Sequence, residues 1–361
     1  MHEDPDQRLK QEVVGRQTAA KDILDRTERN LRRIKMADIP KVGDKVTMLT
    51  GMKPLVLYHK DCLDGFGAAY AAYLALGDEA EYQAVQYHEP PPLMSEILGR
   101  DVYILDFSFP KPVMEAIMQD ARSVVWLDHH KTAFEMWCPG ELIRYSCKFP
   151  VIILDNNKSG ALLAYEFFHA SKEVPLLFRI IDDGDRWQFK LPFTRAVTKA
   201  LWSYAPWSFS YWTVQGWGSP NKDEDLYAVE KLVGEGSAIL RYHEQNVKAI
   251  VEALTRPCKF EVPQDLTPGD MFGTESPWPV VFGLSANCPH FMSSDIGHEL
   301  ALKSGTFGLL WSVGSKDRVR CGLRSNGDYD VSAIAKAFGG GGHKNAAGFE
   351  IDLHTLLGWI K

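Results

Sequence analysis

The chain has 361 residues, a formal net charge of −7, 45% hydrophobic residues and 24% charged residues. These values are typical of a globular protein with room for two domains and well-buried cores. The acidic balance argues against a generally basic surface for long nucleic acids, but it leaves room for a local phosphate-binding cleft. The N-terminus lacks the apolar core of a signal peptide, and no apolar run approaches the length of a membrane span. We therefore expect no membrane segment.

The cysteines show no CxxC pair and no other zinc-binding spacing. The six are Cys62, Cys138, Cys147, Cys258, Cys288 and Cys321. In a chain of this size without a secretory signal, reduced thiols are the simplest interpretation. The composition therefore predicts a cytoplasmic protein.

Residues 1–50 are predicted to be an N-terminal extension. The stretch from residue 10 to residue 35 is highly charged with sparse apolar positions, and residues 45–49 resemble a short strand. The basic run at residues 29–35 could contact phosphate or an acidic partner. Such a run is more often a solvated helix face, which is the interpretation we favour.

From Lys53 onward, short apolar runs alternate with helical patterns. Strands are predicted over residues 54–58, 82–87, 101–105 and 123–127. Helices are predicted over residues 66–76, 111–120, 162–170 and 175–181. Strands that alternate with helices predict an α/β fold with a largely parallel sheet covered on both faces. We assign residues 51–205 to this N-terminal domain.

Residues 206–255 are predicted to be an aromatic segment followed by a connecting helix. Aromatic residues crowd positions 201–217, where they either pack against a neighbouring domain, which we favour, or stack on bases. Apolar residues at helical spacing over 222–254 predict one linking helix, which is either continuous or broken at Gly234 and Gly236.

Residues 256–361 are predicted to form a smaller α/β domain. Its strands are expected over residues 280–284, 306–313 and 318–323, and its helices over residues 295–303 and 331–338. The whole chain is thus expected to be an α/β protein in which a helical linker joins two domains.

Four acidic clusters follow predicted strands or helices in the N-terminal domain. They are His59 to Gly65, Asp106, Asp128-His129-His130, and Asp182 to Asp185. Ligands of parallel sheets bind beyond the carboxyl ends of the strands, which is where these residues fall. Asp and Gly are also ordinary turn residues, so each cluster taken alone has a structural interpretation. Imidazole and carboxylate together suit divalent metals, and four such clusters in strand order predict a two-metal site.

With a glycine-rich motif near the C-terminus, these clusters resemble the DHH phosphoesterase family. The C-terminal motif, Gly339 to Phe349, is similar to the signature of the DHH-associated C-terminal domain. The resemblance covers about residues 53–350. It implies a catalytic domain that uses two Mn²⁺ or Mg²⁺ ions to hydrolyse phosphodiester or phosphoanhydride bonds.

The resemblance also implies roles for individual residues. The expected metal ligands are His59, Asp61, Asp64, Asp106, Asp128, His129, Asp183 and Asp185. Asp106 and Asp128 are the candidates for bridging positions. His129 is expected at the metal and His130 on the phosphate side, so Asp128, His129 and His130 form the candidate catalytic group.

Two motifs leave alternatives open. The family pattern has two acids two residues apart after the histidine, whereas Asp61 and Asp64 are three apart with Cys62 between them. Either Asp61 reaches the metal through a bulged loop, or the site lacks one carboxylate, and Cys62 could be a ligand. In the last cluster we favour Asp183 over Asp185 and expect the other to bond Arg186 or to orient a ligand.

The glycine run is predicted to bind the substrate. Backbone amides of Gly340, Gly341 and Gly342 can approach a phosphate closely, because glycine has no Cβ, and His343 adds a polar contact. Arg320 and Arg324 alternate on a predicted strand, where they are either solvated or available to grip a phosphate.

The sequence therefore predicts a metal-dependent phosphodiesterase that acts on short single-stranded nucleic acid or small nucleotides. Two alternatives are a phosphoanhydride hydrolase for pyrophosphate or polyphosphate, and a nucleotide-binding protein without turnover. Either would use the same scaffold, and a homodimer is compatible with all three.

Overall fold

The computed structural model describes residues 52–87, 89–137, 150–170, 172–261, 280–314 and 318–360. The predicted N-terminal extension, its basic run and the strand at 45–49 lie outside these residues, as do Cys138 and Cys147. Residues Lys53–Lys361 form one compact unit.

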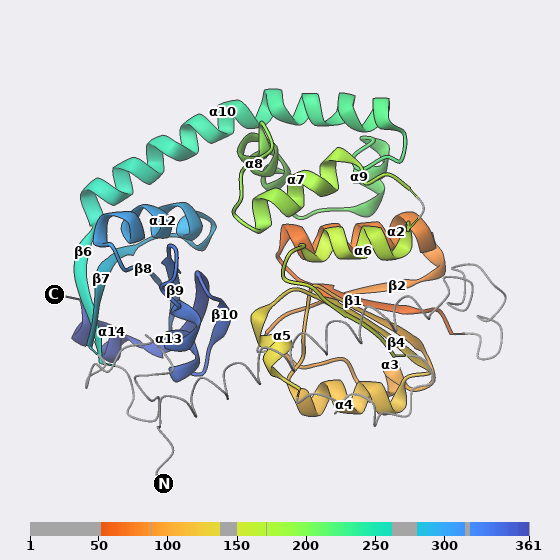
Figure 1. The fold of residues 1–361 in the computed structure, drawn as a ribbon, viewed down its shortest axis with the longest axis horizontal. Coiled ribbons are helices and arrows are strands. Elements are labelled where there is room, and N and C mark those ends of the chain that lie inside the picture. Colours follow the sequence, from red (N-terminus) through yellow and green to blue (C-terminus); the bar gives the residue numbers. More distant parts are fainter. Residues whose placement is uncertain are drawn as a thin grey trace, which may run out of the picture. The chain divides into compact units, whose positions relative to one another are not determined.

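A five-stranded parallel sheet organises the first half of this unit (Figure 1). Its strands are β1 (Leu55–His59), β2 (Glu81–Val85), β3 (Asp101–Leu105), β4 (Ser123–Asp128) and β5 (Pro150–Leu154). The spatial order is β2-β1-β3-β4-β5, and every pairing is parallel. Strands β1, β3 and β4 are therefore neighbours, and their carboxyl ends meet at one edge.

Helices cover both faces of this sheet. The first group is α2 (Leu63–Leu76), α6 (Gly160–Phe168) and α7 (Leu176–Asp185). The second is α3 (Met94–Ile97), α4 (Lys111–Asp120) and α5 (Lys131–Glu135), and a short 3₁₀ turn, η2 (Gly77–Glu79), follows α2. Along β4, Val125 and Leu127 pack in the core with α2 and α6, whereas Val124 and Trp126 pack in the core with α4. Both sides of each central strand are buried, which explains its unbroken apolar run.

Several helix boundaries differ from those predicted, and two of the differences change where candidate ligands lie. Helix α2 begins at Leu63 rather than Phe66, so Asp64 lies in its first turn. Helix α7 continues to Asp185, through the acidic cluster that was expected to be a turn. The strand β5 and the short helices α3 and α5 were not predicted.

The aromatic segment forms part of the core. It contains α8 (Thr194–Ser203) and α9 (Phe209–Val214). Phe209 stacks on Phe66 of α2, with ring centroids 4.8 Å apart, and Trp212 is fully buried. These side chains therefore pack, as the favoured interpretation expected, but against α2 of the parallel-sheet domain and not against a neighbouring domain, which corrects that part of the prediction.

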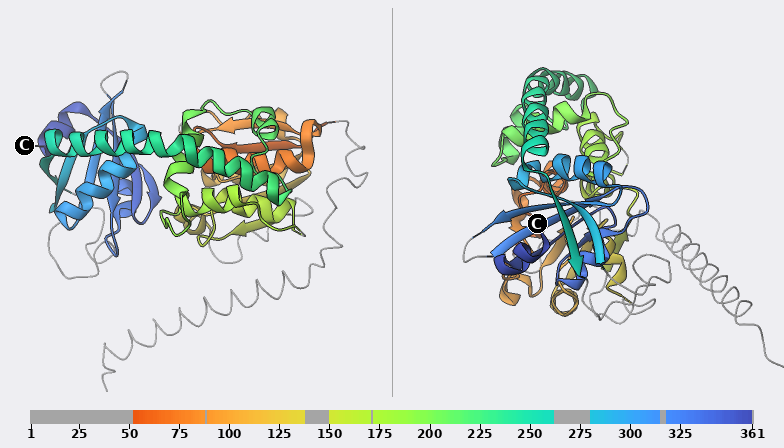
Figure 2. Two further views of the ribbon diagram at one scale, coloured as in Figure 1. Left: turned by 90° about the horizontal axis from the view of Figure 1, so that it is seen from above. Right: turned by 90° about the vertical axis from the view of Figure 1, so that its left-hand side faces the viewer.

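Helix α10 (Lys222–Leu254) is one uninterrupted helix of 33 residues (Figure 2). The Asn221 side chain caps its first turn by accepting from the amide of Asp223 at 3.1 Å. Neither glycine breaks it. Among the described residues, no helix combines the length and the apolar character that crossing a membrane requires.

A six-stranded mixed sheet forms the second half of the unit. Its strands are β6 (Arg256–Glu261), β7 (Val280–Asn287), β8 (Phe307–Val313), β9 (Arg318–Ser325), β10 (Gly341–His343) and β11 (Ala346–Asp352), in the spatial order β10-β11-β9-β8-β7-β6. Its helices are α12 (Ser293–Ser304), α13 (Val331–Ala337) and α14 (Leu353–Trp359), and a 3₁₀ turn, η4 (His290–Met292), precedes α12. The predicted α/β class is confirmed for both halves, although β6, β10, β11 and α14 were not predicted.

A buried carboxylate connects α12 to the helices of the first half. Asp295 accepts from Arg195 Nη2 at 2.5 Å and from Lys199 Nζ at 2.9 Å, both on α8. It also lies 2.7 Å from His243 Nε2 on α10. Burial opposes the ionised carboxyl, but these cationic and hydrogen-bonding partners hold the pKa of Asp295 well below its ordinary value.

The packing of α10 on α8 gives a paired prediction. A Cβ added to Gly236 would lie 1.9 Å from the carbonyl oxygen of Ala196, whereas one added to Gly234 would meet nothing within 4 Å. We expect Gly236→Ala to destabilise the fold by about 1–3 kcal/mol through overpacking. Gly234→Ala should stabilise it by up to about 1 kcal/mol through helix propensity. Urea unfolding of the two variants measures this, and shifts of the same sign would contradict the packing.

The Asp295 cluster gives a pH-dependent prediction. Because the folded pKa is depressed, its contribution to stability is complete above the unfolded pKa and is lost as pH falls below about 4. We expect Asp295→Asn to lower the free energy of unfolding at pH 7, and the difference from wild type to narrow by about 1 kcal/mol by pH 3. Urea titrations at both pH values test this. A pH-independent difference would show that the ion pairs do not stabilise the fold.

Candidate metal centre

The sheet topology brings the predicted clusters to one place. His59 ends β1, Asp106 follows β3, and Asp128, His129 and His130 lie at the end of β4. Asp106 has a positive φ of 55°, which turns the chain sharply as it leaves the strand. Strand order alone therefore places these donors side by side.

Asp106 is the centre of the arrangement and is 1% exposed. Its Oδ2 lies 3.5 Å from His59 Nδ1 and 3.8 Å from Cys62 Sγ. Its Oδ1 lies 3.1 Å from His129 Nε2 and 3.9 Å from His130 Nδ1. The two oxygens of one carboxylate thus face two different sets of potential metal ligands.

His129 Nε2 faces three carboxylates. Besides Asp106, it lies 3.5 Å from Asp64 Oδ2 and 3.6 Å from Asp185 Oδ2. Burial opposes a protonated imidazole, yet the three acids outweigh it and raise the pKa of His129 well above its ordinary value. A divalent cation at this point would satisfy the same acids while binding the neutral ring.

Asp128 is fully buried and orients the histidine pair. Its Oδ1 accepts from the backbone amides of His129 and His130 at 2.7 and 3.1 Å, and lies 2.7 Å from His130 Nδ1. Its Oδ2 accepts from Ser108 Oγ. Ser108 was not singled out from the sequence, and a lone serine two residues after Asp106 gives no signal of this role.

Asp64 is held by the start of α6. Its Oδ2 accepts from the amide of Gly160 at 2.6 Å and its Oδ1 from the amide of Ala161 at 2.9 Å. A Cβ on Gly160 would lie 2.4 Å from Asp106 Cβ, and one on Gly65 would lie 2.3 Å from the His59 carbonyl oxygen. Both glycines are needed for this close approach, although only Gly65 was noticed in the sequence.

The structure brings Asp185, and not Asp183, to the cluster. Asp183 accepts from the amides of Lys190 and Leu191 at 2.9 and 3.0 Å and from Thr194 Oγ1 at 2.6 Å. It therefore fixes the loop into α8, which contradicts the preference for Asp183 as the ligand. The residue that pairs with Arg186 is Asp182, at 3.3 Å.

Asp61 does not join the cluster either. It has a positive φ of 54° and an exposed side chain, whereas Cys62 is grouped with His59 and Asp106. The bulged-loop alternative for Asp61 is therefore not what the structure shows.

The glycine motif forms a hairpin, β10–β11, instead of a loop. Cβ atoms on Gly340 and Gly342 would lie 2.0 Å from the Gly348 carbonyl oxygen and 2.5 Å from that of Ala346, so chain packing requires both glycines. Gly341 faces Thr132 of α5, whose Cγ2 would lie 3.4 Å from an added Cβ.

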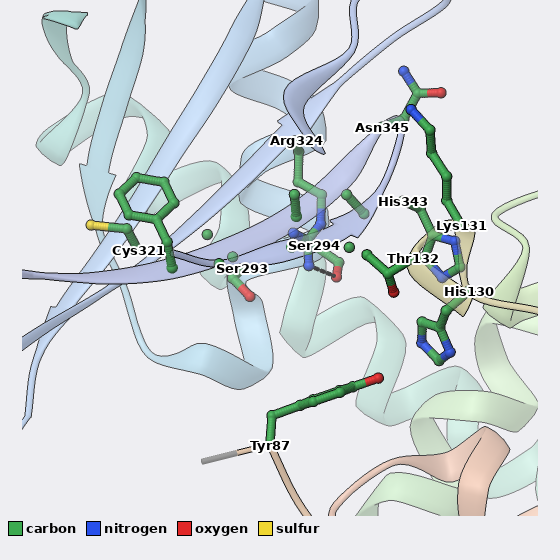
Figure 3. Close-up of a pocket in the computed structure, with 18 of the residues that line it drawn as sticks. Tyr87, His130, Lys131, Thr132, Ser293, Ser294, Cys321, Arg324, His343 and Asn345 are labelled. Atoms are coloured by element: carbon green, nitrogen blue, oxygen red, sulfur yellow. Dashed lines mark hydrogen bonds between the residues drawn. The ribbon is translucent and has the colours of Figure 1, made fainter. Parts of the chain in front are cut away.

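His343 of β10 lies against the candidate catalytic histidines, His129 and His130. Its ring stacks on that of His130, with centroids 4.7 Å apart and an interplanar angle of 21° (Figure 3). Burial and the two neighbouring histidines lower the pKa of His343 to about 3, so it is neutral at ordinary pH. The glycine motif is thereby joined to the metal cluster by contact.

A large cavity opens beside these histidines, and Arg324 projects into it. Arg324 Nη2 donates to Ser294 Oγ at 3.0 Å, and burial lowers the pKa of this guanidinium to about 10 (Figure 3). Arg320 also lines the cavity, but its side chain is 72% exposed and Nε lies 3.4 Å from Glu350 Oε1. Tyr87, which sequence reasoning missed, lies across the cavity from Arg324.

Residues 301–357 match the family model described as the DHHA1 domain. The C-terminal part of this chain is a DHHA1 domain. The match lies inside the predicted second domain of 256–361 and includes the hairpin with His343. It confirms the C-terminal part of the resemblance that the sequence suggested.

Other similarities are more distant. The chain is 28% identical over 312 residues to an uncharacterized protein of Acanthamoeba polyphaga mimivirus, an alignment that covers 81% of this chain and 66% of that relative. Manganese-bound RecJ of Thermus thermophilus aligns at 13% identity and a TM-score of 0.42, covering 85% of this chain and 50% of RecJ. The pGpG-specific phosphodiesterase PggH of Vibrio cholerae aligns at 15% identity and a TM-score of 0.41, covering 84% and 95%. At these TM-scores the likeness assigns no activity to this chain.

The two acids of α7 give a matched prediction. We expect Asp185→Asn to weaken Mn²⁺ binding by about tenfold or more, with an unchanged unfolding midpoint, because it removes a carboxylate from the cluster. Asp183→Asn should instead lower stability, because it weakens three hydrogen bonds in the loop. Calorimetric Mn²⁺ titration and thermal unfolding of both variants separate the roles. Loss of Mn²⁺ affinity in a stable Asp183→Asn protein would reverse our assignment.

Proposed function

We propose that this chain is a metal-dependent phosphoesterase that hydrolyses phosphodiester bonds of short single-stranded nucleic acid or small nucleotides. The observation that carries the proposal is the position of the Asp106 carboxylate. One of its oxygens faces His59 and the other faces His129, beside a DHHA1 domain. Pairs of divalent ions that share a carboxylate are typical of phosphoryl-transfer sites.

The donors fit divalent cations. Among the described residues, four groups of three place their ligand atoms within 4.8 Å of one another; two of the groups include Asp106 and the other two include His129. Among the described residues, Asp106 Oδ1 and His59 Nδ1 are buried without a hydrogen-bond partner. Buried polar atoms are rarely left unsatisfied in proteins, so these atoms support a bound cation. Bound divalent ions polarise phosphoryl oxygens and activate water as a nucleophile.

The chain's own residues would hold and orient the substrate. Asp128 fixes the ring of His130 through Nδ1, which directs the rest of the ring toward His343 and the cavity. Arg324 offers a guanidinium to a phosphate, and Asn326 Nδ2, which lines the same cavity, has no hydrogen-bond partner within the described ranges. Arg320, paired with Glu350 and largely exposed, would contribute less.

The cavity favours a small ligand that carries bases. Tyr87 is 39% exposed and Trp187 is 36% exposed, and both line the cavity, so they offer aromatic faces for stacking. Pyrophosphate has no group that would use them. The net charge of −7 argues against a generally basic surface for a long duplex.

Hydrolysis assays with Mn²⁺ test the proposal. We expect turnover of dinucleotides, short oligonucleotides or cyclic dinucleotides, and a loss of about 100-fold or more in kcat/KM in Asp128→Ala, because the histidine pair loses its anchor. Asp155→Asn is the matched control, since this acid follows β5 at the same edge of the sheet but its carboxylate accepts from Asn157 of its own turn. Its activity should equal that of wild type.

Three outcomes would contradict the proposal. Phosphate release from pyrophosphate with no cleavage of any oligonucleotide would identify a phosphoanhydride hydrolase. Nucleotide binding without a metal requirement and without turnover would identify a binding protein. Equal activity in wild type and Asp128→Ala would place the reaction elsewhere.

A further inference from the structure

The donor set on one side of Asp106 contains a thiol. Cys62 Sγ lies 3.8 Å from Asp106 Oδ2, which also lies 3.5 Å from His59 Nδ1. The three ligand atoms lie within 4.8 Å of one another. The other oxygen of Asp106 faces His129, which in turn lies beside Asp64 and Asp185, and this group offers only nitrogen and oxygen.

The backbone conformation directs the side chain of Cys62, and not that of Asp61, toward Asp106. Asp61 adopts a positive φ of 54°, and its side chain is exposed. Cys62 follows in an extended conformation with φ −127° and ψ 130°, as the residue that precedes α2. The Cys62 carbonyl accepts from the Phe66 amide at 2.9 Å, which fixes this residue to the first turn of the helix. The chain therefore presents sulfur to Asp106 and the Asp61 carboxylate to solvent.

An unsatisfied polar atom lies at the same point. Asp106 is only 1% exposed, and His59 Nδ1, 3.5 Å from Asp106 Oδ2, is buried without a hydrogen-bond partner among the described residues. The Cys62 thiol, 3.8 Å from the same oxygen, is only a weak hydrogen-bond donor and satisfies it poorly. A cation bound by sulfur, nitrogen and oxygen would satisfy all three residues at once.

The donor chemistry favours borderline-soft metals. Mg²⁺ prefers oxygen ligands, whereas thiolate with imidazole suits Zn²⁺ and its neighbours in the first transition row. Tetrahedral Zn²⁺ with ordinary bond lengths would separate its sulfur and oxygen ligands by about 3.5 Å and its nitrogen and oxygen ligands by about 3.4 Å. The observed separations of 3.8 and 3.5 Å are close to these values.

We propose that Cys62, His59 and Asp106 form a thiolate-ligated site that binds Zn²⁺-like metals in preference to Mg²⁺. Binding displaces the thiol proton to solvent, and the sulfur then donates its electron pair to the metal. The inference deepens the proposed function, on which it rests for the presence of metal at Asp106. The two ions of the centre would accordingly differ, because the site around His129 has no sulfur.

Cobalt spectroscopy of the full chain tests the site without turnover. We expect Co²⁺ titration of the wild type to produce a near-ultraviolet thiolate-to-cobalt charge-transfer band. The band should be absent in Cys62→Ser and present in Cys288→Ala, a matched control because Cys288 lines the cavity outside the cluster. Cys62→Ser should bind Zn²⁺ about tenfold more weakly or worse at one site.

A second variant, Cys62→Asp, distinguishes loss of the sulfur ligand from loss of the folded structure. Cys62→Asp replaces sulfur with a carboxylate and should abolish the band while it raises Mg²⁺ affinity relative to the wild type. Co²⁺ binding to the wild type without a charge-transfer band would overturn this inference and leave the proposed function standing. No Co²⁺ binding to the wild type at all would overturn both. A band that persists in Cys62→Ser would assign the sulfur to another cysteine and overturn the inference.

Discussion

The two carboxylate oxygens of Asp106 face two different groups of potential metal ligands, and the rest of the candidate metal centre depends on this arrangement. A carboxylate that is 1% exposed would be costly to ionise alone, because burial removes its hydration. Burial would raise its pKa, but His129 and His59 beside it outweigh that effect and lower the pKa of Asp106 well below its ordinary value. The parallel sheet supplies these partners at little cost, since β1, β3 and β4 are neighbours whose ends meet at one edge.

Residues around Asp106 hold the other potential ligands in position. Asp128 holds the backbone and ring of His130, the start of α6 holds Asp64, and glycines at positions 65 and 160 allow the chains to approach. On the opposite wall, the hairpin of the DHHA1 domain places His343 on the ring of His130. Lys131 Nζ, 2.7 Å from Asp330 Oδ2, adds a further connection between the same two halves of the unit.

The sequence predicted most of the sheet domain and the donors that end its strands, because parallel strands with buried faces leave long apolar runs that stop abruptly. It could not choose between Asp183 and Asp185. That choice required knowing that α7 continues to Asp185. On a helix, Asp182 and Asp185 share a face, whereas Asp183 lies about 100° from Asp182 and about 160° from Asp185 around the axis, toward α8. Likewise, the choice between Asp61 and Cys62 depends on one positive φ angle, which no spacing rule reveals. The short glycine strand β10 has too little side-chain pattern to be recognised from sequence.

The central claim is that Asp106 lies between two metal ions. Anomalous diffraction from crystals of the full chain grown with Mn²⁺ tests this most directly, because it locates each ion without reference to activity. The account predicts two anomalous peaks per chain, one beside each carboxylate oxygen of Asp106, with His129 next to one and His59 next to the other. A single peak, or two peaks that both lie away from Asp106, would contradict it.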